Sequence, residues 1–246
     1  MFYDSLGDPK APAIIFLNGA GEVFSFARQY GFQDRFHLII PHLPGTGEES
    51  DSEYSLRACV DGVLELIGTL GKPTVTLVGF SLGAQLIIPI VCAVPQRISS
   101  AVMVSPWILK PEREVRKISR MLILTAPLER SLWFNRQYCR RLGLDEAQTQ
   151  AHLSYVRRTQ RDYMHRVIQD GVDIESYPAF ASLALPMLAL CGEKEPRIMK
   201  DSVLELQKRN PLCTARILTD HAHDIPSLRP EEFVHIIETW LIGKNG

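Results

Sequence analysis

Short apolar runs rich in β-branched residues recur along the chain and predict buried strands. The clearest run is "PTVTLVGF" at residues 73–80, which Pro73 bounds at its start. Similar runs occupy residues 13–17, 36–41, 100–105, 185–192 and 215–219. Strands that are apolar along their whole length are typical of a parallel sheet covered on both faces.

Between these runs, apolar residues return at steps of three and four, which predicts helices. A helix is expected to follow Ser55, and another is expected over "SLGAQLIIPIVCAV" after the run at 73–80. Pro230 is expected to open the last helix, and residues 22–34 are expected to hold one or two helical turns. The alternation of strands and helices predicts an α/β fold with a mostly parallel, doubly wound sheet.

Residues 108–180 interrupt this alternation. They contain no convincing strand but three helical stretches, at 111–127, 130–143 and 145–171. We therefore expect a core of residues 1–107 and 181–246 with an inserted helical cap, or lid, at 108–180. The insertion holds 13 Lys or Arg against 9 Asp or Glu, whereas the rest holds 14 against 19. This excess is explained either by solvated helix faces or by an entrance that attracts anionic substrates.

Composition indicates more about the possible partners of the protein than about its reaction. The 246 residues are 46% hydrophobic, enough for one sizeable core, and the net charge of -1 does not indicate a nucleic-acid partner. The five cysteines form no C-x-x-C pair and no metal-ligand spacing, as expected of buried thiols in a reducing compartment. No signal-peptide pattern is seen, and Pro89 interrupts the longest apolar run. We expect a cytoplasmic protein with no membrane partner; its oligomeric state stays open.

One serine stands where a strand passes into a helix. Ser81 lies in "GFSLG", between Gly79 and Gly83. A sharp turn at this point packs its neighbours closely, so glycines provide room that a Cβ would fill. The turn exposes the Ser81 hydroxyl at a helix N-terminus, where free N–H groups favour a developing oxyanion. The pattern predicts a nucleophile.

A nucleophilic serine needs a base, and the base needs an orienting acid. In a parallel sheet these groups are expected in loops that follow the strands. Two such loops after Ser81 hold candidates: "CGEKEP" offers Glu193 and Glu195, and "DHAHDIP" offers His221 and His223. For the other five histidines a structural or surface role is expected: His37, His42, His152, His165 and His235.

These motifs resemble the α/β-hydrolase superfamily, in particular its small esterase-like members with a helical cap, over residues 13–242. The segment "LNGAGE" is similar to the family loop that begins His-Gly, with Asn18 in place of the histidine. The resemblance implies an oxyanion hole formed by the N–H groups of Ala20 and Leu82. The segment "HLPGTGEES" is similar to a second family loop, with His42 where an aspartate is common.

The resemblance also selects among the acids and bases. The family pattern G-x-x-D-P matches "GEKEP" and assigns Glu195 rather than Glu193. The family histidine stands seven residues before the proline that opens the last helix, which gives His223, with His221 as the weaker alternative. The implied triad is Ser81, His223 and Glu195.

The expected function is hydrolysis of an ester-like bond of a small-molecule substrate through an acyl-enzyme, with no metal and no organic cofactor. Alternatives are a C–C bond hydrolase or lyase of the same fold, and a weakly hydrolytic small-molecule receptor. Substrate selectivity is expected from the insertion, where four aromatic residues are candidates for the pocket lining or for packing between helices: Trp133, Phe134, Tyr138 and Tyr155.

Overall fold

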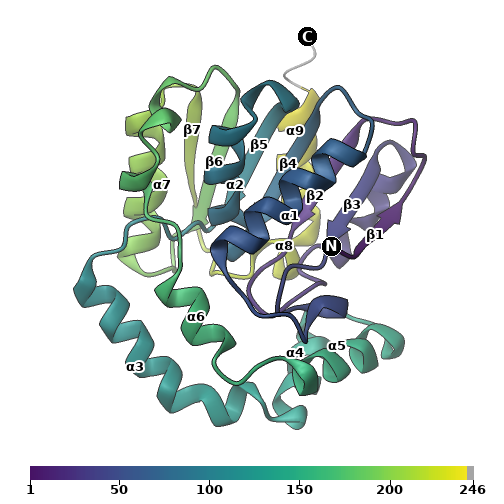
Figure 1. The fold of residues 1–246 in the computed structure, drawn as a ribbon, viewed down its shortest axis with the longest axis vertical. Helices are drawn as coiled ribbons and strands as arrows, with labels where there is room; N and C mark the ends of the chain where they lie inside the picture. The colour runs from purple at the N-terminus through teal and green to yellow at the C-terminus, as the bar shows by residue number, and fades with distance from the viewer. Residues whose placement is uncertain (243–246) are drawn as a thin grey trace.

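A computed structural model describes residues 1–242, except the side chains at 122, 123, 126, 127, 129 and 242. A seven-stranded sheet runs through its centre in the order β1-β3-β2-β4-β5-β6-β7 (Figure 1). The strands are β1 (Tyr3–Leu6), β2 (Ala13–Leu17), β3 (His37–Pro41), β4 (Val75–Phe80), β5 (Ile98–Val104), β6 (Met187–Gly192) and β7 (Cys213–Leu218). Every neighbouring pair is parallel except β1 with β3. The prediction of a mostly parallel sheet is confirmed.

Helices cover both faces of the sheet because side chains along each buried strand point alternately to the two sides. On β2, Ile15 and Leu17 belong to one apolar cluster, whereas Ile14 and Phe16 belong to the other. The first cluster lies under α1 (Leu56–Thr69), α2 (Leu82–Ala93) and α7 (Arg197–Arg209). The second lies under η1 (Ala27–Asp34), α8 (Ile225–Leu228) and α9 (Pro230–Ile242). The sheet is therefore doubly wound, as expected.

Four helices lie between β5 and β6 in the chain, beyond the edge where the parallel strands end (Figure 1). They are α3 (Glu112–Glu129), α4 (Leu132–Leu142), α5 (Glu146–Arg158) and α6 (Tyr163–Gln169). Short 3₁₀ turns connect other elements at η2 (Gly47–Glu49), η3 (Pro95–Arg97), η4 (Ile174–Ser176) and η5 (Pro178–Ser182). The division into a core and a cap at 108–180 stays a prediction, and residues 243–246 of the expected core lie outside the described residues.

Two local features differ from the sequence expectation. Strand β1 was not expected, because "YDSL" is short and exposed on one side, and its pairing with β3 decides its conformation. The stretch at 145–171 was expected as one helical stretch, but it is divided between Arg158 and Tyr163. Thr159 is extended there, with ψ 135°, and its hydroxyl donates to the carbonyl of Gly45 at 3.3 Å. Contact with a distant loop accompanies the break.

Within residues 1–242, no helix combines the length and the apolar character that crossing a membrane requires.

Candidate active site

Ser81 occupies a strained turn between β4 and α2. Its backbone has φ 51° and ψ -109°, values that side-chain-bearing residues seldom adopt, and its N–H donates to the carbonyl of Val104 at 2.8 Å. The flanking glycines are required by close packing. A Cβ on Gly79 would stand 2.7 Å from the backbone nitrogen of Ala84, and one on Gly83 would collide with the Leu17 carbonyl. The local sequence thus holds the hydroxyl at the end of β4.

A hydrogen-bonded chain joins Ser81 to the loops after β6 and β7. His223 Nδ1 lies 2.7 Å from Glu195 Oε2, and His223 Nε2 lies 3.2 Å from Ser81 Oγ. Because an ionised carboxylate only accepts, Nδ1 carries the proton and donates a hydrogen bond to Glu195. Nε2 of the neutral ring is then an acceptor for the Ser81 hydroxyl. This is the arrangement that a general base requires.

Glu195 is 4% exposed, yet three donors surround its carboxylate. Besides His223, the N–H of Gly192 donates to Oε1 at 2.6 Å and the hydroxyl of Ser105 donates to Oε1 at 2.7 Å. Burial alone would raise the pKa of Glu195, but these hydrogen bonds and the charge of His223 outweigh burial and lower it below its ordinary value. The carboxylate is therefore ionised over the neutral pH range.

Ser105 contacts the Glu195 carboxylate, whereas the sequence pattern indicated only the end of a strand at this residue. It is fully buried and has φ 53°. Its N–H donates to the Leu190 carbonyl at 2.7 Å, so the residue bridges the ends of β5 and β6. A serine directly after a buried apolar strand was the only sequence signal, and such a serine has many other uses.

His223 is partly exposed, with 43% of its side chain accessible. Burial lowers its pKa, but the hydrogen bond and charge of Glu195, together with the charges of Asp224 and Glu22, raise the pKa above its ordinary value. The ring of Phe80 packs against the imidazole with centroids 5.0 Å apart. The surroundings therefore stabilise the imidazolium that proton abstraction from Ser81 would generate.

The alternative acid and base lie elsewhere. His221 Nδ1 lies 2.7 Å from the carbonyl of Thr219, and its Nε2 lies 3.0 Å from Glu232 on α9. Glu193 is exposed, and it accepts the N–H of Asp220 at 3.1 Å. Of the candidates in these two loops, the structure brings Glu195 and His223 to Ser81.

The two expected oxyanion donors are in adjacent backbone segments. Leu82 opens α2, where the first N–H groups lack intrahelical partners, and Ala20 follows β2. The N–H of Gly83 donates to the carbonyl of Asn18 at 3.1 Å, which ties the start of α2 to the loop that carries Ala20. The Asn18 side chain has no hydrogen-bond partner among the described residues. Its backbone, rather than its amide, supports the loop.

Two tyrosines from the inserted helices also hold this loop. Tyr163 on α6 is buried, and its hydroxyl accepts the N–H of Gly21 at 3.1 Å. Tyr138 on α4 donates to the carboxyl of Glu22, which also accepts the Ser25 hydroxyl at 2.9 Å. Burial raises the pKa of Glu22 despite these bonds. The loop that bears Ala20 is thus fastened to α4 and α6.

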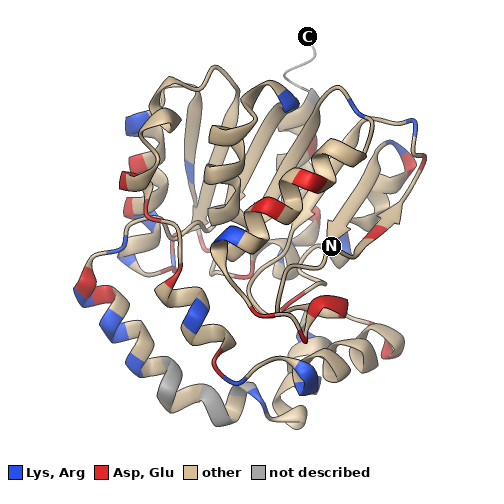
Figure 2. Ribbon diagram, viewed as in Figure 1, with Lys and Arg blue, Asp and Glu red and all other residues tan. Residues whose placement is uncertain are grey.

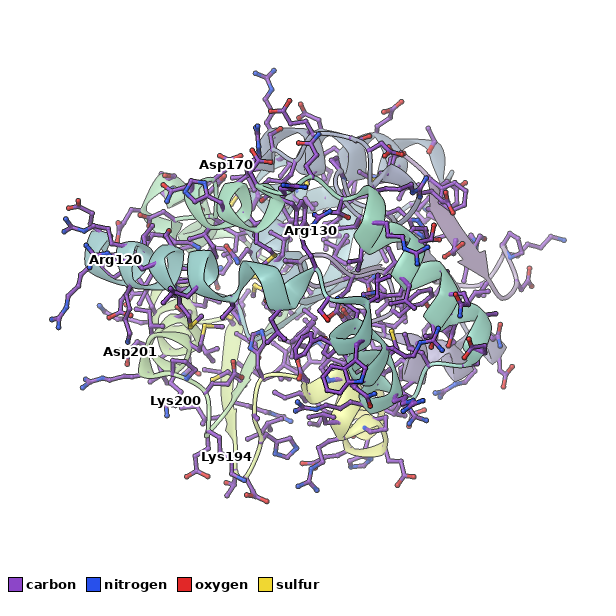
Figure 3. All side chains as sticks on the ribbon, turned by 90° about the horizontal axis from the view of Figure 1, so that it is seen from below. Arg120, Arg130, Asp170, Lys194, Lys200 and Asp201 are labelled. Carbon is purple, nitrogen blue, oxygen red and sulfur yellow. The ribbon has the colours of Figure 1, made fainter. Side chains whose placement is uncertain are left out.

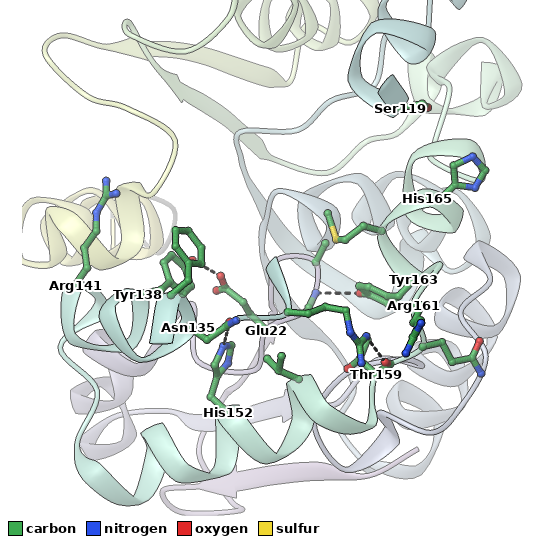
Figure 4. Close-up of a pocket in the computed structure, with 17 residues that line it drawn as sticks. Glu22, Ser119, Asn135, Tyr138, Arg141, His152, Thr159, Arg161, Tyr163 and His165 are labelled. Carbon is green, nitrogen blue, oxygen red and sulfur yellow. Dashed lines mark hydrogen bonds between the residues drawn. The ribbon is translucent and has the colours of Figure 1, made fainter. Parts of the chain in front are cut away.

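A cavity of about 500 Å³ extends from this loop between the inserted helices (Figure 4). Such a volume fits a small-molecule ligand. Phe134 and Tyr138 line it, as the sequence suggested, but Trp133 and Tyr155 do not. Trp133 is 70% exposed, and Tyr155 donates to Glu48 at 3.0 Å. The lining residues are Ala20, Gly21, Glu22, Ser119, Arg130, Phe134, Asn135, Tyr138, Arg141, His152, Val156, Thr159, Gln160, Arg161, Tyr163, Met164 and His165.

In the described part of the chain, no three or more His, Cys, Asp or Glu side chains form a group that could hold a metal ion.

Comparison with known sequences and structures gives a consistent result. A family model described as "Alpha/beta hydrolase family" matches residues 14–236. A search of curated proteins finds no match.

Solved structures resemble the chain along nearly its whole length. A structure from a study of carboxylesterases of Nitrososphaera gargenis has a TM-score of 0.74 at 14% identity, covering 99% of this chain and 94% of the other. MenH from S. aureus has a TM-score of 0.76 at 18% identity and 99% coverage of both chains. A thioesterase domain from the curacin biosynthetic pathway has a TM-score of 0.71 at 15% identity, covering 96% and 94%. At these identities the likeness shows a shared fold.

Proposed function

The chain belongs to the alpha/beta hydrolase family, and from this premise we propose that it is a serine hydrolase that cleaves an ester-like bond of a small molecule. The observation that carries the proposal is the hydrogen-bonded chain from Ser81 through His223 to Glu195. Its members come from three separate loops, and their order matches the nucleophile, base and orienting acid of acyl transfer.

In the proposed reaction, the Ser81 oxygen attacks the substrate carbonyl while His223 Nε2 takes the hydroxyl proton. The carbonyl carbon becomes tetrahedral, and His223 then returns the proton to the leaving alcohol as the acyl-enzyme forms. Water, deprotonated by His223, releases the acid and restores Ser81. Glu195 holds the imidazole with Nδ1 protonated and stabilises its charged form.

The N–H groups of Ala20 and Leu82 stabilise the oxyanion of each tetrahedral intermediate. Removal of one such donor costs about 3 to 4 kcal/mol in comparable sites. The positive end of α2 adds to this field, because Ser81 occupies the position just before the helix. Residues 108–180 form the cap, and the cavity between its helices and the Ala20 loop receives the substrate.

The direct test is covalent labelling with a fluorophosphonate, followed by peptide mass mapping. We expect wild-type protein to be labelled at Ser81, and labelling to be lost in Ser81→Ala and His223→Ala. His235→Ala is the matched control, because His235 is exposed on α9, and it should label as wild type does. His221→Asn tests the alternative base and should retain labelling.

Turnover of short acyl esters, thioesters and C–C substrates then separates an enzyme from a receptor. A hydrolase turns over many equivalents of at least one acyl ester or thioester. Labelling at Ser81 with only stoichiometric ester cleavage would favour the receptor alternative. Cleavage of the C–C substrates alone would favour the alternative of a C–C bond hydrolase or lyase. Absence of labelling in folded wild-type protein would refute the assignment of Ser81 as the nucleophile.

A further inference from the structure

Two arginines from separate turns of the helices between β5 and β6 line the cavity. Arg130 follows α3, and Arg161 lies in the turn between α5 and α6. Both line the cavity. The Arg130 guanidinium donates to the carbonyl of Thr159 at 3.0 Å, which places it two residues from Arg161. Figure 4 shows Arg161 beside Thr159, across the cavity from Tyr138, and Figure 3 shows Arg130 where α3 ends.

No carboxylate among the described residues forms an ion pair with Arg130 or Arg161. Among the described residues, Arg130 donates only to a backbone carbonyl, and no hydrogen bond or ion pair to Arg161 is found. Asp162, the neighbour of Arg161, lies 2.7 Å from Arg166 instead. The basic surplus of the insertion is visible along α3 in Figure 2. Two like charges that line one cavity raise the local potential, and an anion between them lowers it.

The remaining charged groups of the lining do not cancel this field. Glu22 is the sole acid among the described lining residues, and Tyr138 and Ser25 already hydrogen-bond its carboxyl. Burial raises the pKa of Glu22 above its ordinary value. Arg141 lies 3.6 Å from Asp224. Among the described lining residues, Arg130 and Arg161 therefore carry positive charge without a paired carboxylate.

We propose that Arg130 and Arg161 bind an oxyanion group, a carboxylate or a phosphate, on the part of the substrate remote from the reacting carbonyl. Guanidinium groups match the planar geometry and charge of such groups. Ala20 lines the same cavity, so the expected oxyanion donor and the arginines border one space. The inference rests on the proposed serine hydrolase and names its substrate class: esters or thioesters with a negatively charged tail.

The test compares substrates that differ only in the tail charge. Mono-4-nitrophenyl glutarate and 4-nitrophenyl pentanoate have acyl chains of equal length, one ending in a carboxylate and one in a methyl group. Butyryl phosphopantetheine and butyryl pantetheine form the corresponding phosphate pair. We expect kcat/KM to favour the charged member of one pair, and the favoured pair identifies the anion as a carboxylate or a phosphate.

The variants Arg130→Gln and Arg161→Gln should reduce this preference by about tenfold or more each, the loss expected for one charge-assisted hydrogen bond. Arg161→Lys should retain part of it. Arg157→Ala is the control, because Arg157 is exposed on α5 and does not line the cavity, and it should keep the wild-type preference. Equal rates within both substrate pairs, or equal losses on charged and neutral substrates in the arginine variants, would overturn the inference.

A readout without catalysis separates this inference from the proposed hydrolase. Glutarate or inorganic phosphate should raise the thermal unfolding midpoint of Ser81→Ala protein but not that of Ser81→Ala combined with Arg161→Gln. If fluorophosphonate labelling fails while this anion stabilisation is observed, the hydrolase proposal fails and the anion site stands. If labelling succeeds and neither anion discriminates between the two proteins, the anion site fails alone.

Discussion

Replacement of Ser105 by alanine tests whether the buried hydroxyl holds the Glu195 carboxylate. The substitution removes one of three donors, leaving the N–H of Gly192 and the imidazole of His223. Ser105 is fully buried, so water does not readily replace the lost hydroxyl. The backbone keeps its positive φ, because alanine and serine bear the same steric cost there.

The magnitude follows from the kind of bond that is lost. A hydrogen bond to a charged group contributes about 1.5–3 kcal/mol to stability, and 1.36 kcal/mol corresponds to one pKa unit. The pKa of Glu195 should therefore rise by about one to two units in Ser105→Ala. The folded-state pKa of Glu195 is lowered, so the stability it contributes is present above the unfolded pKa and is lost as pH falls through the folded pKa.

We therefore expect Ser105→Ala to lose about 1.5–3 kcal/mol of unfolding free energy at pH 7, and the loss to shrink as pH falls below the ordinary glutamate pKa of 4.5. Urea unfolding at a series of pH values measures this difference. Ser202→Ala is the matched control: Ser202 is equally buried, but its hydroxyl donates to the neutral carbonyl of Ile198 at 2.7 Å. A loss in Ser105→Ala that is as independent of pH as the control's would refute the reasoning.

The remaining predictions concern the hydrogen-bonded chain of Ser81, His223 and Glu195, and two glycines. Glu195→Gln should lower kcat/KM by about 10³- to 10⁴-fold, as tautomer-disrupting changes do in comparable triads. For Glu193→Gln, kcat/KM should stay within about twofold of the wild-type value, because the Glu193 side chain is exposed and does not contact His223. Because the pKa of His223 is raised above 6.5, the acidic limb of the pH profile of kcat/KM should be centred above pH 6.5. Glu195→Gln removes the charge that raises this pKa, so the acidic limb should move to lower pH. A move to higher pH would contradict the assigned pair. Gly83→Ala should prevent folding and therefore fluorophosphonate labelling. Gly68→Ala on α1, where a Cβ meets nothing within 4 Å, should raise the free energy of unfolding by about 0.5–1 kcal/mol. Circular dichroism and labelling yield measure both effects.

The sequence by itself determined the parallel strands β2 to β7 and the turn that carries Ser81. A continuous apolar run such as β4 is stable only when both faces are covered, and G-x-S-x-G directly after it leaves few alternatives to a tight strand-to-helix turn. The sequence spacing that resembles the family also selected Glu195 and His223 from the four candidates in their loops. These are local signals, carried by residues that lie close together in the chain.

Only the tertiary structure decided which distant groups meet. The bond of Ser105 to Glu195 joins residues 90 positions apart, and that of Arg130 to the Thr159 carbonyl joins residues 29 apart. No periodicity encodes such pairs, because hydrogen bonds and charge fields depend on distances that the folded backbone sets. The bond between the Thr159 hydroxyl and the Gly45 carbonyl, at the break after α5, also joins residues far apart in the chain. Local pattern determined the elements, and their packing determined the chemistry between them.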